Sequence, residues 1–442
     1  MKILFIDPRE KISKGEKNNR NRLIFLLYSR YYAFRRPLAF SILAALTPNH
    51  YEISVIQGGI NEIDFDKKYD LVGLTTTTVF ANIAYKIADE FRSRGVTVVI
   101  GGWHASALPE ETKQHADSVV VGEADETWPQ LLKDFENKKL KPFYIPIRPV
   151  NLDLIPHAKN VYPLENTIGI HATRGCPNGC EFCSITNMKY RRNYRMRPIK
   201  EVIGEIRSST NKVFAFQDAS ITTNTEYTKK LFKELIPLNK KFSTMGNIHD
   251  LDDEELLKVA QEAGCYSWVI GFESINQKSL DTINKKKNKV KDFSRIIKKI
   301  QDYDMAVDGC FIFGFDFDTI DIFDETDNFI RKNNIKMSYL DVLVPFPGTP
   351  IFERFEREGR ILSKDWSKYD GHNYVVYQPK LMSPEILLSK TQELEKRWHT
   401  KHRSIERIIK NIRFGFNNFI EVTTIELALH LKKKGTKSQN KK

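Results

Sequence analysis

Short apolar runs alternate with amphipathic helical segments along most of the chain, and this alternation restricts the possible folds more than any other feature. In the first part, apolar runs at 2–7, 52–57, 70–75, 97–100 and 118–121 have the length of strands, and a clear helical pattern covers 79–94. Such alternation is typical of parallel sheets with helices on both faces. We therefore predict an α/β protein whose residues 1–140 form a doubly wound, Rossmann-like domain.

The alternation stops over residues 141–165, which contain several prolines and little periodicity and are predicted to be a linker. It resumes over 166–378. The predicted strands there are 167–171, 212–217, 242–245, 267–271, 306–313 and 339–344, and the predicted helices are 199–208, 225–235, 252–263, 290–301 and 322–332. Six strand–helix units are fewer than the eight of a closed barrel, so we predict an open, partial (β/α)6 TIM barrel. Residues 379–442 should be a helical, basic extension.

The loop after the first barrel strand has three cysteines at the spacing C-x3-C-x2-C: Cys176, Cys180 and Cys183. Three soft thiolates on one loop suit an iron–sulfur cluster. Gly175 and Gly179 allow the backbone to turn around it. Because a fourth cysteine is missing, one iron keeps an open position, which is typical of a reaction site. The alternatives are a zinc knuckle completed by His171, or three unrelated buried thiols.

This cysteine motif resembles that of the radical S-adenosylmethionine (radical SAM) enzymes. In that superfamily the amino and carboxylate groups of SAM chelate the open iron of a 4Fe–4S cluster, and an electron from the cluster cleaves SAM to a 5′-deoxyadenosyl radical. The resemblance implies a cluster held by the three cysteines. It also implies that Phe182, which precedes the last cysteine, lies near the adenine of SAM.

Polar residues at the carboxyl ends of the barrel strands are further candidates for SAM contacts, because barrel chemistry gathers there. Asp218 and Ser220 match a family segment that more often reads Asp-Asp-Asn. Glu273 ends the fourth strand, where burial of a carboxylate without a hydrogen-bonding partner would be costly. Its partner is either a SAM group or a neighbouring strand or Arg. Gly314 ends the fifth strand.

The strand ends of the N-terminal domain have hydroxyls and bare backbone amides, at the place where doubly wound sheets bind ligands. Segments 36–39, 101–111 and 121–127 resemble the cobalamin-binding domain of the cobalamin-dependent radical SAM family. The resemblance implies cobalamin, with contacts from these residues: Thr75, Thr76, Gly101, Gly102, His104, Gly122 and Glu123.

Many cobalamin domains supply a His to the cobalt from an Asp-x-His-x-x-Gly loop after the first strand. The corresponding segment here, 7–15, contains no His, as is common in this radical SAM family. The alternative is a Rossmann-like domain that binds no cofactor and shapes the mouth of the barrel.

The resemblance, which includes hopanoid methylases, implies a C-methyltransferase that acts on an unactivated carbon of a small-molecule or lipid substrate. It also implies a reductase or flavodoxin-type electron donor. Two alternatives remain: a radical enzyme that forms or rearranges a C–C bond, as in cyclisation, without methyl transfer; or a non-catalytic cobalamin or cluster sensor.

The net charge of +13 is concentrated at the C-terminal end, where residues 396–442 contain thirteen Lys and Arg but three Glu. Ile405, Ile408, Ile409 and Ile412 form an apolar stripe there, which either docks on its own domain or contacts an anionic membrane. The tail from Lys432 should be disordered. We interpret the basic stretch 189–197 as a loop cap that anchors the region of SAM with Arg–carboxylate pairs, rather than as a nucleic-acid site.

The five cysteines show no pairing pattern, which favours a reducing compartment. The N-terminal apolar run is too short for a signal peptide, and no apolar run approaches the ~20 residues of a membrane span. We expect a soluble, cytoplasmic protein.

Overall fold

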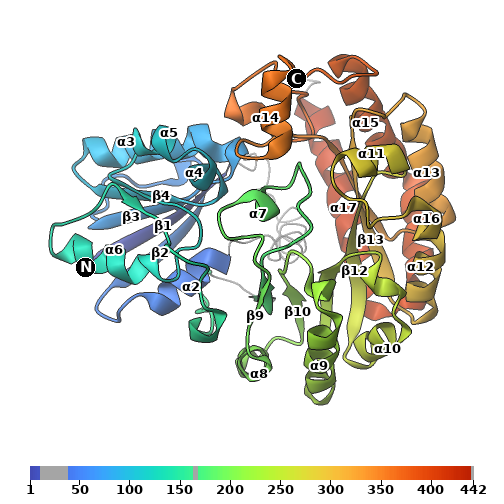
Figure 1. Cartoon of the computed structure of the whole chain (residues 1–442), viewed down its shortest axis with the longest axis horizontal. Coiled ribbons are helices and arrows are strands. Elements are labelled where there is room, and N and C mark those ends of the chain that lie inside the picture. The colour runs from blue at the N-terminus through green and yellow to red at the C-terminus, as the bar shows by residue number, and fades with distance from the viewer. Residues whose placement is uncertain (10–37, 163–167, 440–442) are drawn as a thin grey trace.

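The structure is a computed structural model, and it describes residues 1–9, 38–162 and 168–439, with side chains as far as Leu427. Two six-stranded parallel sheets form separate halves of the molecule (Figure 1). Residues 36 and 37 of the predicted cobalamin motif, and 166 and 167 at the predicted start of the barrel, lie outside the described residues.

The first sheet has the strand order β2-β1-β3-β4-β5-β6. Its strands are β1 (Lys2–Pro8), β2 (Glu52–Gly58), β3 (Leu71–Thr75), β4 (Thr97–Gly101), β5 (Ser118–Val120) and β6 (Phe143–Tyr144). Leu4 and Ile6 pack with α3 (Ala81–Ser93) on one face, while Ile3 and Phe5 pack on the other with α2 (Leu38–Leu46) and α6 (Thr127–Glu136). Burial on both faces explains the continuous apolar strands. The predicted doubly wound sheet is confirmed.

Strand β6 was not predicted, and it lies inside the stretch interpreted as a linker. Val119 N–H donates to the carbonyl of Pro142 (2.9 Å), and Val121 N–H donates to that of Tyr144 (3.0 Å). The sheet therefore continues beyond residue 140. Two residues between prolines have no periodicity from which a strand could be recognised.

The second sheet has the order β14-β13-β12-β11-β10-β7, which confirms an open barrel of six parallel strands. Its strands are β7 (Ile168–Ile170), β10 (Val213–Phe216), β11 (Lys241–Gly246), β12 (Cys265–Glu273), β13 (Ala306–Phe313) and β14 (Met337–Val342). The helices between them are α8 (Ile199–Ser208), α9 (Thr225–Leu235), α10 (Glu254–Glu262), α11 (Gln277–Thr282), α12 (Val290–Asp302) and α13 (Ile322–Lys332). Helix α12 buries Phe293, Ile296, Ile297 and Ile300, the spacing of one helical face.

Shorter elements complete the two halves: α4 (Trp103–Ala107), α5 (Pro109–Lys113), α7 (Ser184–Asn187), and the antiparallel pair β8 (Thr173–Arg174) and β9 (Arg195–Met196). Helices α14 (Pro350–Arg357), α15 (Pro384–Trp398), α16 (Lys401–Asn411) and α17 (Phe416–Gln439) follow the barrel. Ser383 caps α15, as its Ser-Pro-Glu sequence predicts, by accepting from Ile386 N–H. The tail predicted to be disordered from Lys432 is helical to Gln439, because it continues a helix whose first turns are docked.

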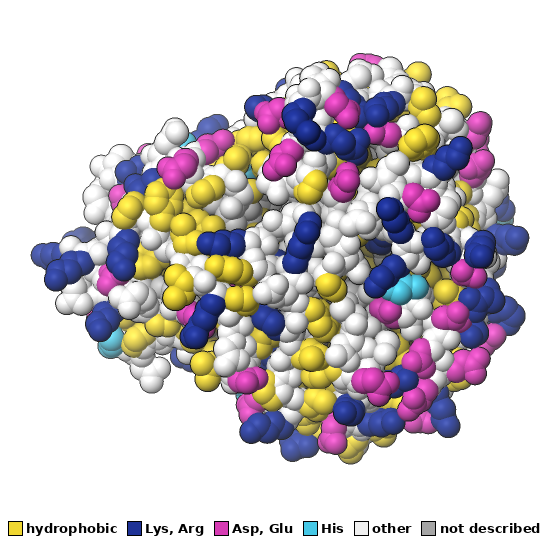
Figure 2. Space-filling view, in the orientation of Figure 1, with side chains coloured by type: hydrophobic (Ala, Val, Ile, Leu, Met, Phe, Trp, Pro, Cys, Tyr) yellow, Lys and Arg dark blue, Asp and Glu magenta, His cyan; other side chains and the backbone are white. Residues whose placement is uncertain are grey.

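No helix in the described part of the chain has the length and apolar content to cross a bilayer. On the face shown in Figure 2, acidic and basic side chains are interspersed over the barrel half, whereas apolar side chains gather over the N-terminal half.

Phe272→Ala should lower the free energy of unfolding by about 3–5 kcal/mol, because it removes a ring that stacks on Phe311 (centroids 5.4 Å apart) in the barrel core. Urea denaturation followed by circular dichroism measures the loss. Phe416→Ala is the matched control, since that ring is 74 % exposed and its removal should change stability little. Equal losses in both variants would contradict this description of the core.

Candidate active site at the junction of the two halves

The cysteine loop follows β8 and is held by backbone and side-chain hydrogen bonds from α7. Thr186 Oγ1 donates to the carbonyl of Cys176 (2.8 Å) and accepts from Gly179 N–H (3.1 Å). Asn187 donates to the carbonyls of Cys180 (3.0 Å) and Cys183 (2.8 Å). The loop is thus shaped without use of its thiols, all of which are free.

The two glycines of the loop adopt positive φ angles, +90° at Gly175 and +67° at Gly179, as predicted. A side chain at Gly175 would collide with the backbone carbonyls of Arg191 and Asn193. This close approach places the start of the loop directly on the following basic stretch.

Burial raises the pKa of all three loop thiols, that of Cys180 to about 12. The charge of the partly buried Lys285 opposes this rise in the pKa of Cys180. Thiols with high pKa values become thiolates when they coordinate a metal, so the site suits a metal cofactor of soft-ligand preference. A zinc knuckle would gather the three thiols and His171 around one ion; no three His, Cys, Asp or Glu side chains of the described residues are grouped in that way. The thiolates of a cluster bind separate iron atoms.

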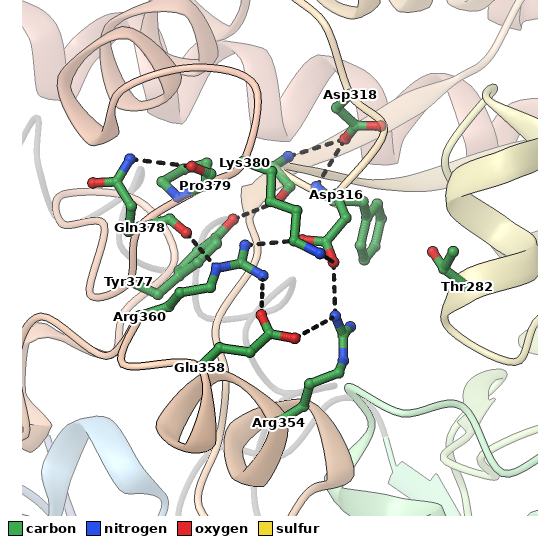
Figure 3. Close-up of polar contacts among 12 residues, drawn as sticks. Thr282, Asp316, Asp318, Arg354, Glu358, Arg360, Tyr377, Gln378, Pro379 and Lys380 are labelled. Atoms are coloured by element: carbon green, nitrogen blue, oxygen red, sulfur yellow. Dashed lines mark hydrogen bonds and ion pairs between the residues drawn. The ribbon is translucent and has the colours of Figure 1, made fainter.

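Phe182 packs on the barrel core beside Phe315, with ring centroids 6.2 Å apart. Phe315 follows Gly314, whose N–H donates to Asp318 (3.0 Å) and whose carbonyl accepts from the Tyr377 hydroxyl (2.7 Å). Figure 3 labels Asp318 and Tyr377. Both polar groups of Gly314 are therefore engaged within the protein. Its φ of +101° turns the chain so that Phe315 reaches Phe182.

Asp218, predicted to contact SAM, holds the strand that leads into the cysteine loop. Its carboxylate accepts from the N–H groups of Ala172 and Thr173 and from the Thr173 hydroxyl (2.5 Å). Burial raises the pKa of Asp218 to about 6, although these hydrogen bonds oppose the rise. Ser220, also buried, lies within 3.2 Å of the Thr222 hydroxyl.

Glu273 ends β12 with a φ of +65° and is 8 % exposed. Its partner is the partly buried ammonium of Lys285, from the segment after α11. An Arg or a neighbouring strand was the predicted alternative to SAM as this partner, and Lys285 was not predicted. This ion pair lies close enough to the thiols for both charges to affect the pKa of Cys180.

A cavity of about 310 Å³ lies between the N-terminal sheet and the start of the barrel. Five predicted cobalamin residues line it: Thr75, Gly101, Gly102, Gly122 and Glu123. Apolar side chains form its inner wall, among them Phe5, Phe40 and Trp128. His171 and Arg174 of the barrel form the opposite wall.

Thr76 and His104 are not among the residues that line this cavity. The His104 side chain is fully buried, 3.2 Å from Glu111 and 3.4 Å from the Thr78 hydroxyl. Backbone groups of Thr76 pair with Gly101 and His104. Both residues shape the loop around Gly102, where a Cβ atom would lie 2.7 Å from the Thr76 nitrogen.

Buried ion pairs join the two halves beside the cavity. Arg174, two residues before Cys176, donates to both carboxylate oxygens of Asp125 (2.7 and 3.0 Å). Glu123 accepts two bonds from Arg195 (2.6 and 2.9 Å) and pairs with Arg191 (3.2 Å). The basic stretch 189–197 thus forms the predicted Arg–carboxylate pairs, but these two arginines pair with Glu123 of the N-terminal half, beside the cavity.

The segment after the barrel contacts both halves of the molecule. The Trp366 indole donates to Glu111 of the N-terminal half (2.8 Å). Arg354 pairs with Asp316 at the end of β13 (2.7 Å) and with Glu181 inside the cysteine loop (3.4 Å), and Figure 3 shows Arg360 on the same aspartate. These contacts fix the cysteine loop relative to the N-terminal half.

The comparisons with known proteins agree with this geometry. Residues 170–330 match the Radical SAM superfamily, and residues 37–132 match the B12 binding domain. The chain is 34 % identical to bacteriochlorophyllide d C-8(2)-methyltransferase of Chlorobaculum tepidum, over 80 % of this chain and 84 % of the relative, and 30 % identical to bacteriochlorophyllide d C-12(1)-methyltransferase of the same organism, over 90 % and 91 %. The chain belongs to the cobalamin-dependent radical SAM enzymes.

Solved structures of this family have the same fold. The methyltransferase TsrM of Kitasatospora setae superposes with a TM-score of 0.64 at 15 % identity, covering 91 % of this chain and 84 % of TsrM. The enzyme OxsB superposes with a TM-score of 0.68 at 13 % identity, covering 93 % and 71 %.

The family's cofactors are a 4Fe–4S cluster, SAM and cobalamin, and the residues present suit them. Three free thiols on one glycine-shaped loop suit the cluster. The cavity combines apolar walls with glycine backbone. Within the described residues, His171 Nδ1, Arg174 Nε and Arg191 Nε at its barrel side have no hydrogen-bond partner. A large ligand with apolar ring edges and amide groups fits such a surface.

Replacing Cys176, Cys180 or Cys183 by Ala should abolish stable iron binding after anaerobic reconstitution with iron and sulfide, because each thiol is proposed to hold one iron. Iron per protein after desalting is the measurement. Cys265→Ala is the matched control, since that buried thiol lies in β12 outside the loop and should leave iron unchanged. Iron retention in the loop variants would contradict the assignment.

Asp125→Asn should lower the free energy of unfolding by about 3–5 kcal/mol, because it leaves the buried Arg174 charge without its main partner. The double variant Arg174→Met with Asp125→Leu should recover much of this loss. Chemical denaturation compares them. Asp252→Asn breaks the exposed pair with Arg295 and should matter far less; a similar effect in both single variants would contradict a special role for the buried pair.

Proposed function

We propose that this enzyme transfers a methyl group to an unactivated carbon of a large, mostly apolar small molecule. One observation carries the proposal: the loop with the three thiols begins at the wall of the glycine-lined cavity. Arg174 lines that cavity and stands two residues before Cys176. The residues suited to the two cofactors therefore lie on the two sides of one junction, as is required if both cofactors are to act on the same substrate carbon.

The residue roles are proposals as well. The three cysteines would hold the cluster, and Phe182 with Phe315 would flank the adenine of SAM. The Glu273 carboxylate would accept hydrogen bonds from SAM, and the Ser220 hydroxyl would donate one to SAM or accept one from it. Asp218 and Gly314 would act through the loops that they hold, since their polar groups are already engaged. When bound, these cofactors supply hydrogen-atom abstraction from a carbon and a transferable methyl group.

For cobalamin, the glycines at 101, 102 and 122 and the Thr75 side chain would face the ligand directly. Thr76 and His104 would support it from behind, through the loop around Gly102. Glu123 also lines the cavity, with its carboxylate paired to Arg195. The 1–140 and 166–378 boundaries remain the proposed limits of the two domains, with the sheet of the first extended by β6.

Methyl transfer is favoured over cyclisation by the relatives. The two at 30 % identity or more are both named methyltransferases, whereas the anaerobic magnesium-protoporphyrin IX monomethyl ester cyclase of Cereibacter sphaeroides is 26 % identical and the match covers 60 % of its length. A sensor without catalysis would not need a site suited to SAM beside one suited to cobalamin.

The relatives named for bacteriochlorophyllide and for a hopanoid share large apolar ring systems as substrates. We propose a substrate of this kind, either a tetrapyrrole or a polycyclic lipid. The further partners that we propose are a flavodoxin-type or other reductase donor and an anionic membrane surface at the basic C-terminal extension. A reducing cytoplasm suits five free thiols and a cluster.

The reconstituted enzyme should transfer a trideuterated methyl group from labelled SAM to bacteriochlorophyllide d or to a hopanoid, and also release 5′-deoxyadenosine. Mass spectrometry of the products and of the nucleoside is the measurement. The Cys180→Ala enzyme is the control and should produce neither. Deoxyadenosine together with an altered but unmethylated substrate would contradict methyl transfer and establish the cyclising alternative.

A further inference from the structure

Helix α16, the 3₁₀ turn that follows it (Ile412–Phe414) and the start of α17 present an exposed apolar stripe. Its residues are between 57 % and 74 % exposed: Ile405, Ile409, Ile412 and Phe416. They are spaced four, three and four residues apart, which places the three isoleucines on one helical face. We call these four residues the apolar stripe. Ile408, which the sequence places with the other isoleucines, does not belong to the stripe, because it packs against Met337, Val422 and Ile425.

Buried polar contacts fix the orientation of these helices, so the stripe is held toward solvent. On the opposite face of α16, Arg407 forms a buried ion pair with Glu426 of α17. The Ser404 hydroxyl donates to the same carboxylate (2.6 Å). Rotation of α16 to bury the stripe would leave the Glu426 carboxylate without these partners, at a high cost for a buried charge.

Basic residues surround the stripe. Lys401 and His402 are exposed at the start of α16, and Lys410 and Arg413 are exposed beside Ile409 and Ile412. Lys410 pairs with Glu406 (2.6 Å), and no other acidic residue lies between 400 and 420. Six more lysines follow between 432 and 442 in the sequence. The surface is therefore both apolar and positively charged.

We propose that the apolar stripe and its basic neighbours bind the surface of an anionic lipid bilayer. Side chains of this size left exposed in a row mark an interaction surface. Apolar residues flanked by Lys and Arg are the combination that inserts at an anionic interface, while a purely apolar partner would not use the charges. The inference deepens the membrane contact proposed above and is independent of the methyl-transfer chemistry.

The test is co-sedimentation of the full-length holoenzyme with vesicles of phosphatidylcholine and phosphatidylglycerol. No turnover is needed, so failure here and failure of the proposed chemistry are distinguishable. Lys410→Gln with Arg413→Gln should weaken binding about fivefold per charge removed, equivalent to ~1 kcal/mol per basic residue. Ile409→Glu with Phe416→Glu should abolish binding. Ile236→Glu, at an exposed isoleucine outside the stripe, should bind like the unaltered enzyme.

Three results would overturn the proposal. Equal binding to vesicles of phosphatidylcholine alone would show that the stripe does not require an anionic lipid surface. Unchanged vesicle binding in both stripe variants would show that another surface of the protein contacts the membrane. Absence of vesicle binding, combined with a dimer that Ile409→Glu converts to a monomer, would show that a second copy of the chain covers the stripe. Retained circular dichroism and iron content in each variant confirm that the protein is folded.

Discussion

The buried ion pairs between Arg174 and Asp125 and between Arg195 and Glu123 are the interaction on which the rest of this structure depends. Each half has its own sheet, but the two cores are not fully separate, because Phe352, Trp366 and Tyr369 from the segment after the barrel pack into the core of the first sheet. The cofactors must meet at one place. Bidentate arginine–carboxylate pairs with little exposure are directional, and their desolvation makes any other register of the two halves costly. They therefore specify a geometry more than they add stability.

The same contacts connect the junction to the cysteine loop. Arg174 lies in β8 between two constraints, since Asp218 holds Thr173 on one side and the close approach at Gly175 holds the other. The contacts at the junction of the two halves therefore set the position of the cysteine loop. Arg354 adds a second connection at the far side of the loop, through Glu181 and Asp316. Two independent supports keep the thiols in place without engaging sulfur.

Much of this was predictable from the sequence. Helices α8, α9 and α13 match their predicted bounds, because each has a strong apolar periodicity and clear end signals. The cysteine spacing predicts a cluster site because the motif is local in the sequence. Partners from other elements were not predictable: Lys285, 12 residues after Glu273, and Asp125, 49 residues before Arg174. His104 was expected to contact cobalamin because it belongs to the motif. Its side chain is instead fully buried beside Glu111, a contact that only the tertiary structure creates.

The central claim is that the cluster and cobalamin occupy the two sides of one junction. Electron paramagnetic resonance of the enzyme with cob(II)alamin and a reduced cluster tests it most directly, because both centres are then paramagnetic. We expect the cobalt signal to be broadened by magnetic coupling when the cluster is reduced, and to sharpen when the Cys176→Ala protein is measured instead. A spectrum equal to the sum of two independent signals, or protein with iron but no cobalt, would contradict the account.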